Sequence, residues 1–155
     1  MSLNEPAVPS NQQSDPLWSS LAGYFRHAAN QYPDNDVLIF DDHRHSYQSL
    51  DAASTTIARA LAASGVKKGD HVGILMANCP LYFECLLGIT KLGAVAVLVN
   101  ARYKPAELAY IIENADLTQL ITHDLISEYA NFGDLINEAL TLRETPLLRQ
   151  CILHG

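Results

Sequence analysis

From residue 72 onward, short apolar runs alternate with longer segments whose apolar residues recur at helical spacing. The expected strands are 72–76, 94–99, 117–122 and 150–153, and the expected helices are 80–92, 105–114 and 125–140. Strands separated by helices of this length need crossover connections, which place the strands parallel. The sequence therefore predicts an α/β fold: a doubly wound, mostly parallel sheet with flanking helices.

The first 70 residues predict helices and a hairpin rather than more of this sheet. Apolar residues at helical spacing predict a helix from Leu17 to about residue 32. Residues 37–40 and 45–47 read as a β-hairpin whose polar turn is 41–44. Ser46 is expected to cap a helix over 47–63, and Gly65 to follow its end. Residues 1–16 read as a flexible leader, so the expected organisation is a leader at 1–16 and one α/β unit at 17–155.

Composition excludes several classes of protein. Seventeen acidic residues against ten basic residues give a net charge of −7, which argues against a nucleic-acid partner. The three cysteines, Cys79, Cys85 and Cys151, form no CxxC pair and lie in apolar runs, so we expect buried, reduced thiols and a cytoplasmic protein. The leader has no signal-peptide core, and the most apolar stretch, 86–99, is too short to span a membrane.

A search for motifs that carry chemistry identifies no catalytic residue and no metal site. The sequence has no GxGxxG or GxxxxGK[ST] phosphate loop and no GxSxG nucleophile turn. His43 and His45 form an HxH pair, but two ligands without a nearby third favour solvent-facing polar residues over a zinc site.

One ordered set of short segments is more specific. Residues 46–51 (SYQSLD) resemble the [ST]-Y-x-E-L segment that opens adenylate-forming enzymes, with Ser49 where glutamate is usual. The segments that follow in family order are 65–70 (GVKKGD), 72–75 (VGIL), 78–80 (NCP), 91–95 (KLGAV), 100–103 (NARY), 107–110 (ELAY) and 120–122 (LIT). Together they resemble the N-terminal part of an acyl-CoA synthetase of the AMP-binding, adenylate-forming superfamily. Leu98 departs from the proline of many relatives.

The NAR segment is more similar to the CoA ligase branch than to peptide-synthetase domains, which usually carry an aspartate-proline pair there. Carnitine- and aryl-type CoA ligases are the nearest resemblance. It implies a complete enzyme that uses ATP, Mg²⁺ and CoA to convert a carboxylic acid into an acyl-adenylate and then an acyl-CoA, in fatty acid or aryl acid metabolism. The sequence does not identify the substrate, because the family builds its acyl pocket from later segments.

The resemblance also implies that this chain is the first subdomain of such an enzyme. The family's Ser/Thr/Gly-rich loop ending in Pro-Lys-Gly is absent from these 155 residues. We therefore expect the chain alone to be inactive, to bind no cofactor tightly, to partner the remainder of the synthetase, and to self-associate through uncovered apolar surfaces. The alternatives are a non-catalytic, synthetase-like binding or regulatory module and an unrelated doubly wound domain. The reading frame after Gly155 distinguishes the enzyme piece from the module.

Arg102 is the one candidate site residue. It follows an expected parallel strand, at the sheet edge where ligands bind in open α/β folds. In some CoA ligases, the arginine of the matching segment lies near the nucleotide phosphates of CoA, and a guanidinium suits a phosphate. The alternative is a surface arginine that holds its own loop in place.

Overall fold

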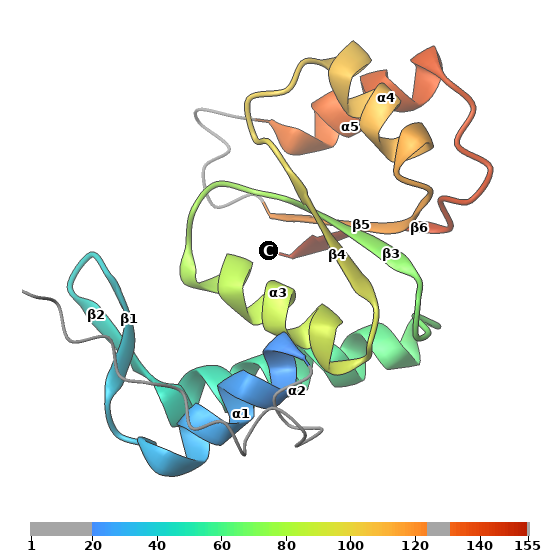
Figure 1. Ribbon diagram of the computed structural model, residues 1–155. Coiled ribbons are helices and arrows are strands. Elements are labelled where there is room, and N and C mark those ends of the chain that lie inside the picture. The colour runs from blue at the N-terminus through green and yellow to red at the C-terminus, as the bar shows by residue number, and fades with distance from the viewer. Residues whose placement is uncertain (1–19, 124–130, 155) are drawn as a thin grey trace, which may run out of the picture.

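The computed structural model describes residues 20–123 and 131–154 of the chain (Figure 1). A four-stranded parallel sheet, in the order β4-β3-β5-β6, forms its centre, and an antiparallel hairpin of β1 and β2 stands apart from it. The strands are β1 (Asp36–Phe40), β2 (His43–Ser46), β3 (His71–Leu75), β4 (Val95–Val99), β5 (Leu117–His123) and β6 (Gln150–His154). The helices are α1 (Leu21–Gln31), α2 (Tyr47–Ala63), α3 (Pro80–Lys91), α4 (Pro105–Asn114) and α5 (Phe132–Leu142). The predicted fold class is confirmed.

Local signals account for the bounds of α2. The Ser46 hydroxyl accepts a hydrogen bond from the Ser49 amide at 3.2 Å, as the sequence predicts for an N-cap. At the other end Gly65 adopts φ +91°, a left-handed conformation that glycine takes without steric cost. The hairpin forms as predicted, but its turn is shorter than expected, because His43 already pairs with Phe40.

Two helix starts differ from the sequence prediction. Ser20 is extended and its hydroxyl accepts from the Gly23 amide, so α1 begins at Leu21 rather than at Leu17. Likewise Asn131 caps α5 through the Asp134 amide, so α5 begins at Phe132 and no helix runs continuously from 125 to 140. Residues 17–19, 125–130 and the expected leader at 1–16 lie outside the described residues.

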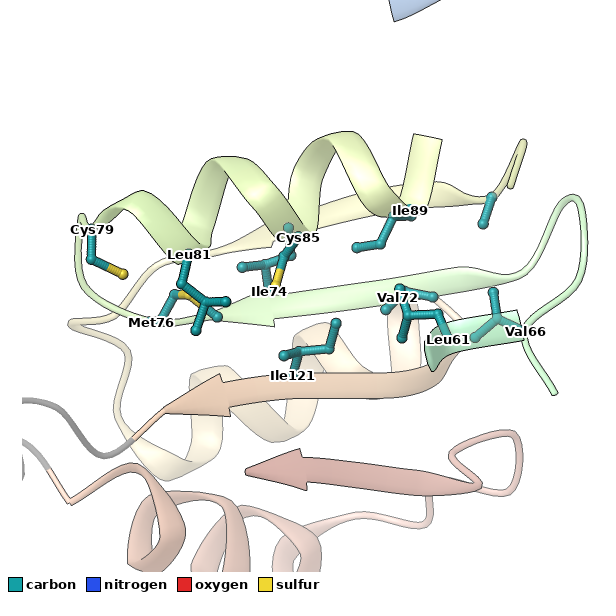
Figure 2. Close-up of a cluster of buried hydrophobic side chains, with 11 residues drawn as sticks. Leu61, Val66, Val72, Ile74, Met76, Cys79, Leu81, Cys85, Ile89 and Ile121 are labelled. Carbon is teal, nitrogen blue, oxygen red and sulfur yellow. The ribbon is translucent and has the colours of Figure 1, made fainter. Parts of the chain in front are cut away.

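Helices cover both faces of the sheet. On one face, α2 and α3 pack on Val72 and Ile74 of β3 and on Ile121 of β5 (Figure 2), and α1 packs against both helices. On the other face, α4 and α5 pack on Leu75 and Leu120. The chain is therefore doubly wound around two apolar cores, one on each side of β3 and β5.

The last strand is less covered than the sequence predicts. Cys79 and Cys85 are buried, as expected, but Cys151 is exposed, because β6 is the edge strand of the described sheet. Arg149, just before β6, holds the strand in place: its amide donates to the Thr118 carbonyl and its guanidinium pairs with Asp70. Within the described ranges, no helix has the length and apolar character needed to cross a membrane.

Candidate ligand site at the carboxyl edge of the sheet

A hollow of about 450 Å³ lies where β3 and β4 end. Parallel strands end at the same edge of a sheet, so the loops that follow β3 and β4 converge there. Its walls come from the end of β3 and the loop after it, from the first turn of α3, and from the end of β4 and the loop after it. The lining residues are Met76, Ala77, Asn78, Tyr82, Leu98, Val99, Asn100, Ala101 and Arg102.

Arg102 lies where the sequence places it, just past the end of β4. Asn100 shapes its loop: the Asn100 side-chain oxygen accepts from the Arg102 amide at 2.9 Å, and the Asn100 carbonyl accepts from the Tyr103 amide at 3.1 Å. Arg102 is exposed, and no carboxylate among the described residues pairs with its guanidinium. The loop is therefore fixed through its backbone, which leaves the guanidinium available to a ligand.

The N-terminus of α3 lies beside the same hollow. The helix begins with Pro80, and within the described residues Cys79 makes no side-chain capping bond to its first turn. A helix N-terminus without such a cap carries partial positive charge from unpaired amides, which favours anions. Together with the Arg102 guanidinium, this makes the hollow electrostatically suited to a negatively charged group.

Tyr82, in the first turn of α3, adds a neutral polar group. Its ring is half-buried, and burial raises the pKa of its hydroxyl. The phenol therefore stays protonated at neutral pH and can donate a hydrogen bond without adding negative charge.

The lining of the hollow combines a positively charged guanidinium with neutral polar and apolar groups. Its lining contains no cysteine, histidine, aspartate or glutamate that could serve as a nucleophile or a general base. Elsewhere in the described part of the chain, no three His, Cys, Asp or Glu side chains gather closely enough to hold a metal ion, and this includes His43 and His45 on the hairpin.

An open parallel α/β sheet with a hollow at its carboxyl edge is the arrangement in which many nucleotide- and coenzyme-binding domains hold their ligands. Comparison with known proteins identifies the family within this broad class. The sequence model of the AMP-binding enzyme family matches residues 25–151. The chain belongs to the AMP-binding enzyme family, as the ordered motifs predicted.

Several curated relatives are named as CoA ligases. The chain is 31% identical over 142 residues to a crotonobetaine/carnitine–CoA ligase of Salmonella paratyphi B, a match that covers 88% of this chain and 25% of the relative. It is 32% identical over 136 residues to the enzyme of that name from Proteus mirabilis, covering 84% of this chain and 24% of that one. The chain thus spans about a quarter of the length of these relatives.

Solved structures agree on the fold. An anthranilate CoA ligase, AuaEII, in complex with anthranoyl-AMP, superposes with a TM-score of 0.78 and 25% identity, over 91% of this chain and 26% of that one. The N-terminal domain of FACL13 from Mycobacterium tuberculosis gives a TM-score of 0.75 at 25% identity, over 87% and 33%. The described fold is therefore that of an adenylate-forming enzyme's N-terminal region.

Sequence reasoning identified Arg102 but not its neighbours across the hollow. Asn78 belongs to the segment 78–80 that carries part of the family resemblance, and Tyr82 lies in the expected helix 80–92. One signal could have indicated both: they lie in the loop and the first helical turn that follow the carboxyl end of β3, and β3 pairs with β4.

Proposed function

We propose that this chain is part of an ATP-dependent, AMP-forming acyl-CoA synthetase that activates a carboxylic acid as its acyl-adenylate and transfers the acyl group to CoA in the cytoplasm. The observation that carries the proposal is the position of Arg102, exposed beside the N-terminus of α3 at the carboxyl edge of β4, in a chain whose relatives are CoA ligases. The complete enzyme would use ATP, Mg²⁺ and CoA, and its acyl pocket would come from other segments.

In this proposal the residues of the hollow bind and orient CoA rather than react. Arg102 pairs with a phosphate of the CoA nucleotide portion, and the amides at the start of α3 add a second attraction for the same charge. Asn100 positions Arg102 by fixing the loop backbone: its side-chain oxygen accepts a hydrogen bond of 2.9 Å from the Arg102 amide. None of these groups touches the carboxylate or the α-phosphate of ATP, so they affect the thioester-forming half-reaction and not adenylate formation.

Replacing Arg102 with alanine in the complete synthetase is expected to raise the KM for CoA by about 10- to 100-fold, the loss of one charge-assisted hydrogen bond worth about 1.5–3 kcal/mol. Carboxylate-dependent ATP–pyrophosphate exchange should stay at its wild-type rate. Lys104→Ala is the matched control, because it removes an exposed positive charge from the same loop and leaves the Lys104 amide bonded to Glu107. Unchanged CoA kinetics in Arg102→Ala would remove Arg102 from the CoA site.

The 155-residue chain alone is expected to show no carboxylate-dependent ATP–pyrophosphate exchange, because its sequence lacks the glycine-rich loop that would hold the triphosphate. The measurement is the incorporation of labelled pyrophosphate into ATP, with short aliphatic and aromatic acids as substrates. An exchange rate above the rate measured without a carboxylic acid would contradict the proposal that this chain alone cannot form an acyl-adenylate.

A further inference from the structure

The loop that carries Arg102 is held by side-chain bonds at two points. After β4, Asn100 fixes the first half of the loop, because its side-chain oxygen accepts from the Arg102 amide at 2.9 Å. Before α4, Glu107 fixes the second half, because its carboxylate accepts from the Lys104 amide at 2.8 Å. Arg102 lies between these two bonds and is exposed at the hollow. The position of its guanidinium therefore depends on both halves of the loop.

The residues on either side of Arg102 are packed against the protein. Ala101 and Tyr103 contact the apolar core on the α4/α5 face of the sheet. The proline that begins α4 restricts the residue before it to an extended backbone, and Lys104 accordingly has φ −86° and ψ 166°. The bond from the Lys104 amide to Glu107 then ties this extended residue to the first turn of α4. With that bond intact, the loop has few alternative backbone conformations.

The negative charge of Glu107 acts on the same site in the opposite direction. Its carboxylate lies in the first turn of α4, where it offsets the partial positive charge of the helix N-terminus. A negative charge on the segment beside a phosphate site disfavours phosphate binding. If only this charge mattered, removing Glu107 would strengthen the binding of an anionic ligand. If Glu107 positions Arg102, removing it would weaken that binding, so the two roles predict effects of opposite sign.

We propose that Glu107 is a positioning residue for the Arg102 guanidinium: by accepting from the Lys104 amide it holds the second half of the loop on α4 and keeps Arg102 at the hollow. Glu107 does not line the hollow, so its effect reaches the ligand through the loop and not by contact. The inference rests on the proposed function, because it needs Arg102 to bind a phosphate of CoA. It adds a second residue, beyond Asn100, on which that binding depends.

Two substitutions of Glu107 separate the two roles. Glu107→Gln removes the charge but keeps an oxygen that can accept from the Lys104 amide, as glutamine does in a capping box, whereas Glu107→Ala removes both. In the complete synthetase we expect Glu107→Ala to raise the KM for CoA by about three- to tenfold, and Glu107→Gln to leave it within about twofold of the wild-type value or lower. Glu113→Ala is the matched control and should leave the KM unchanged, because it removes an exposed carboxylate of the same helix that pairs with Arg143 outside the hollow.

The double variant Arg102→Ala/Glu107→Ala tests whether Glu107 acts through Arg102. Without the guanidinium nothing is left to position, so adding Glu107→Ala to Arg102→Ala should change the KM for CoA by less than about twofold. A further three- to tenfold rise would overturn the inference, as would a KM in Glu107→Ala that equals or falls below the wild-type value. If Arg102→Ala itself leaves CoA kinetics unchanged, the proposed function fails and this inference with it. A normal Arg102 effect without a Glu107 effect refutes this inference alone.

Hydrogen exchange in the 155-residue chain gives a readout that needs no enzymatic activity. The Arg102 and Tyr103 amides both bond within the loop, to the side-chain oxygen and the carbonyl of Asn100. We expect both to exchange at least about threefold faster in Glu107→Ala and at the wild-type rate in Glu107→Gln, because the loop opens locally when its tie to α4 is lost. Amides of β3 and β5 should keep their wild-type rates. Wild-type exchange of the two loop amides in Glu107→Ala, or an equal acceleration in β3 and β5, would overturn the inference.

Discussion

Replacing Lys91 with alanine is expected to lower the free energy of unfolding by about 3–5 kcal/mol. Lys91 ends α3, yet its side chain is only 4% exposed, because it reaches across to α2. Its ammonium nitrogen lies 2.7 Å from the Asp51 carbonyl oxygen and 2.8 Å from the Asp51 carboxylate, the Ser54 hydroxyl and the Thr55 hydroxyl, and these four oxygens share its three N–H donors. One buried charge thus depends entirely on four oxygens of the neighbouring helix.

The oxygens that accept hydrogen bonds from Lys91 are themselves held in place, which makes the loss of stability large. The Ser54 hydroxyl donates to the Leu50 carbonyl and the Thr55 hydroxyl to the Asp51 carbonyl, so each presents its lone pairs toward Lys91. Without the ammonium, the buried Ser54 hydroxyl loses a donor, and the Asp51 carboxylate, whose side chain is 26% exposed, keeps only partial access to water. Removing one member of a buried pair costs more than the pair contributes, because the other member stays behind.

Urea unfolding followed by far-UV circular dichroism measures the effect. Lys67→Ala is the control, since Lys67 is exposed and should change stability by less than about 0.5 kcal/mol. Asp51→Asn should also lower stability strongly, because it leaves the buried ammonium among neutral acceptors without a counter-charge. A Lys91→Ala variant as stable as Lys67→Ala would show that Lys91 contributes nothing to the packing of α2 on α3.

Lys91 also marks the limit of what the sequence could predict. Apolar periodicity over 72–122 predicted the strands and helices, because each element carries its own repeat, and the helices between the strands predicted that the strands run parallel. The starts of α1 and α5 were misplaced, since Ser20 and Asn131 interrupt an apolar spacing that otherwise looks continuous. The Lys91–Asp51 pair joins residues 40 positions apart, and only the packing of α3 on α2 reveals it.

The candidate site could also be predicted only in part. Arg102 could be placed at the carboxyl edge because every parallel strand ends there. That Tyr82 shares its hollow follows from β3 lying next to β4. The exposure of Cys151 follows from β6 lying at the edge of the described sheet. Strand order is set by how crossover helices pack, and the apolar pattern of a strand does not encode its neighbours.

Replacing Gly88 with valine is expected to lower stability by about 3 kcal/mol, and Gly88→Ala by about 1–3 kcal/mol, although alanine favours helix more than glycine does. Gly88 is buried in α3 where that helix approaches α2. A Cβ atom at this position would lie 2.8 Å and 2.9 Å from Ile57 Cγ2 and Cβ, and 3.0 Å from the Ser54 carbonyl oxygen. The Ile57 Cβ and the Ser54 carbonyl oxygen cannot move aside unless the backbone of α2 moves with them, so α2 and α3 must separate.

Gly133→Ala is the matched control, because it adds a methyl group to another helical glycine whose nearest neighbour would be the Asn131 side-chain oxygen at 3.4 Å. That variant should be neutral or up to about 1 kcal/mol more stable. A Gly88→Ala protein that is also more stable would contradict the close approach of the helices.

Separation of α2 from α3 also stretches the bonds from Lys91 to Asp51 and Ser54, so Gly88 and Lys91 should act as one unit. The double variant Gly88→Val/Lys91→Ala is therefore expected to lose less stability than the sum of the two single losses, by about 0.5–3 kcal/mol. Strictly additive losses would mean that the close approach at Gly88 and the buried ammonium stabilise the helix pair independently. Coupling would mean that one shared geometry holds α2 on α3.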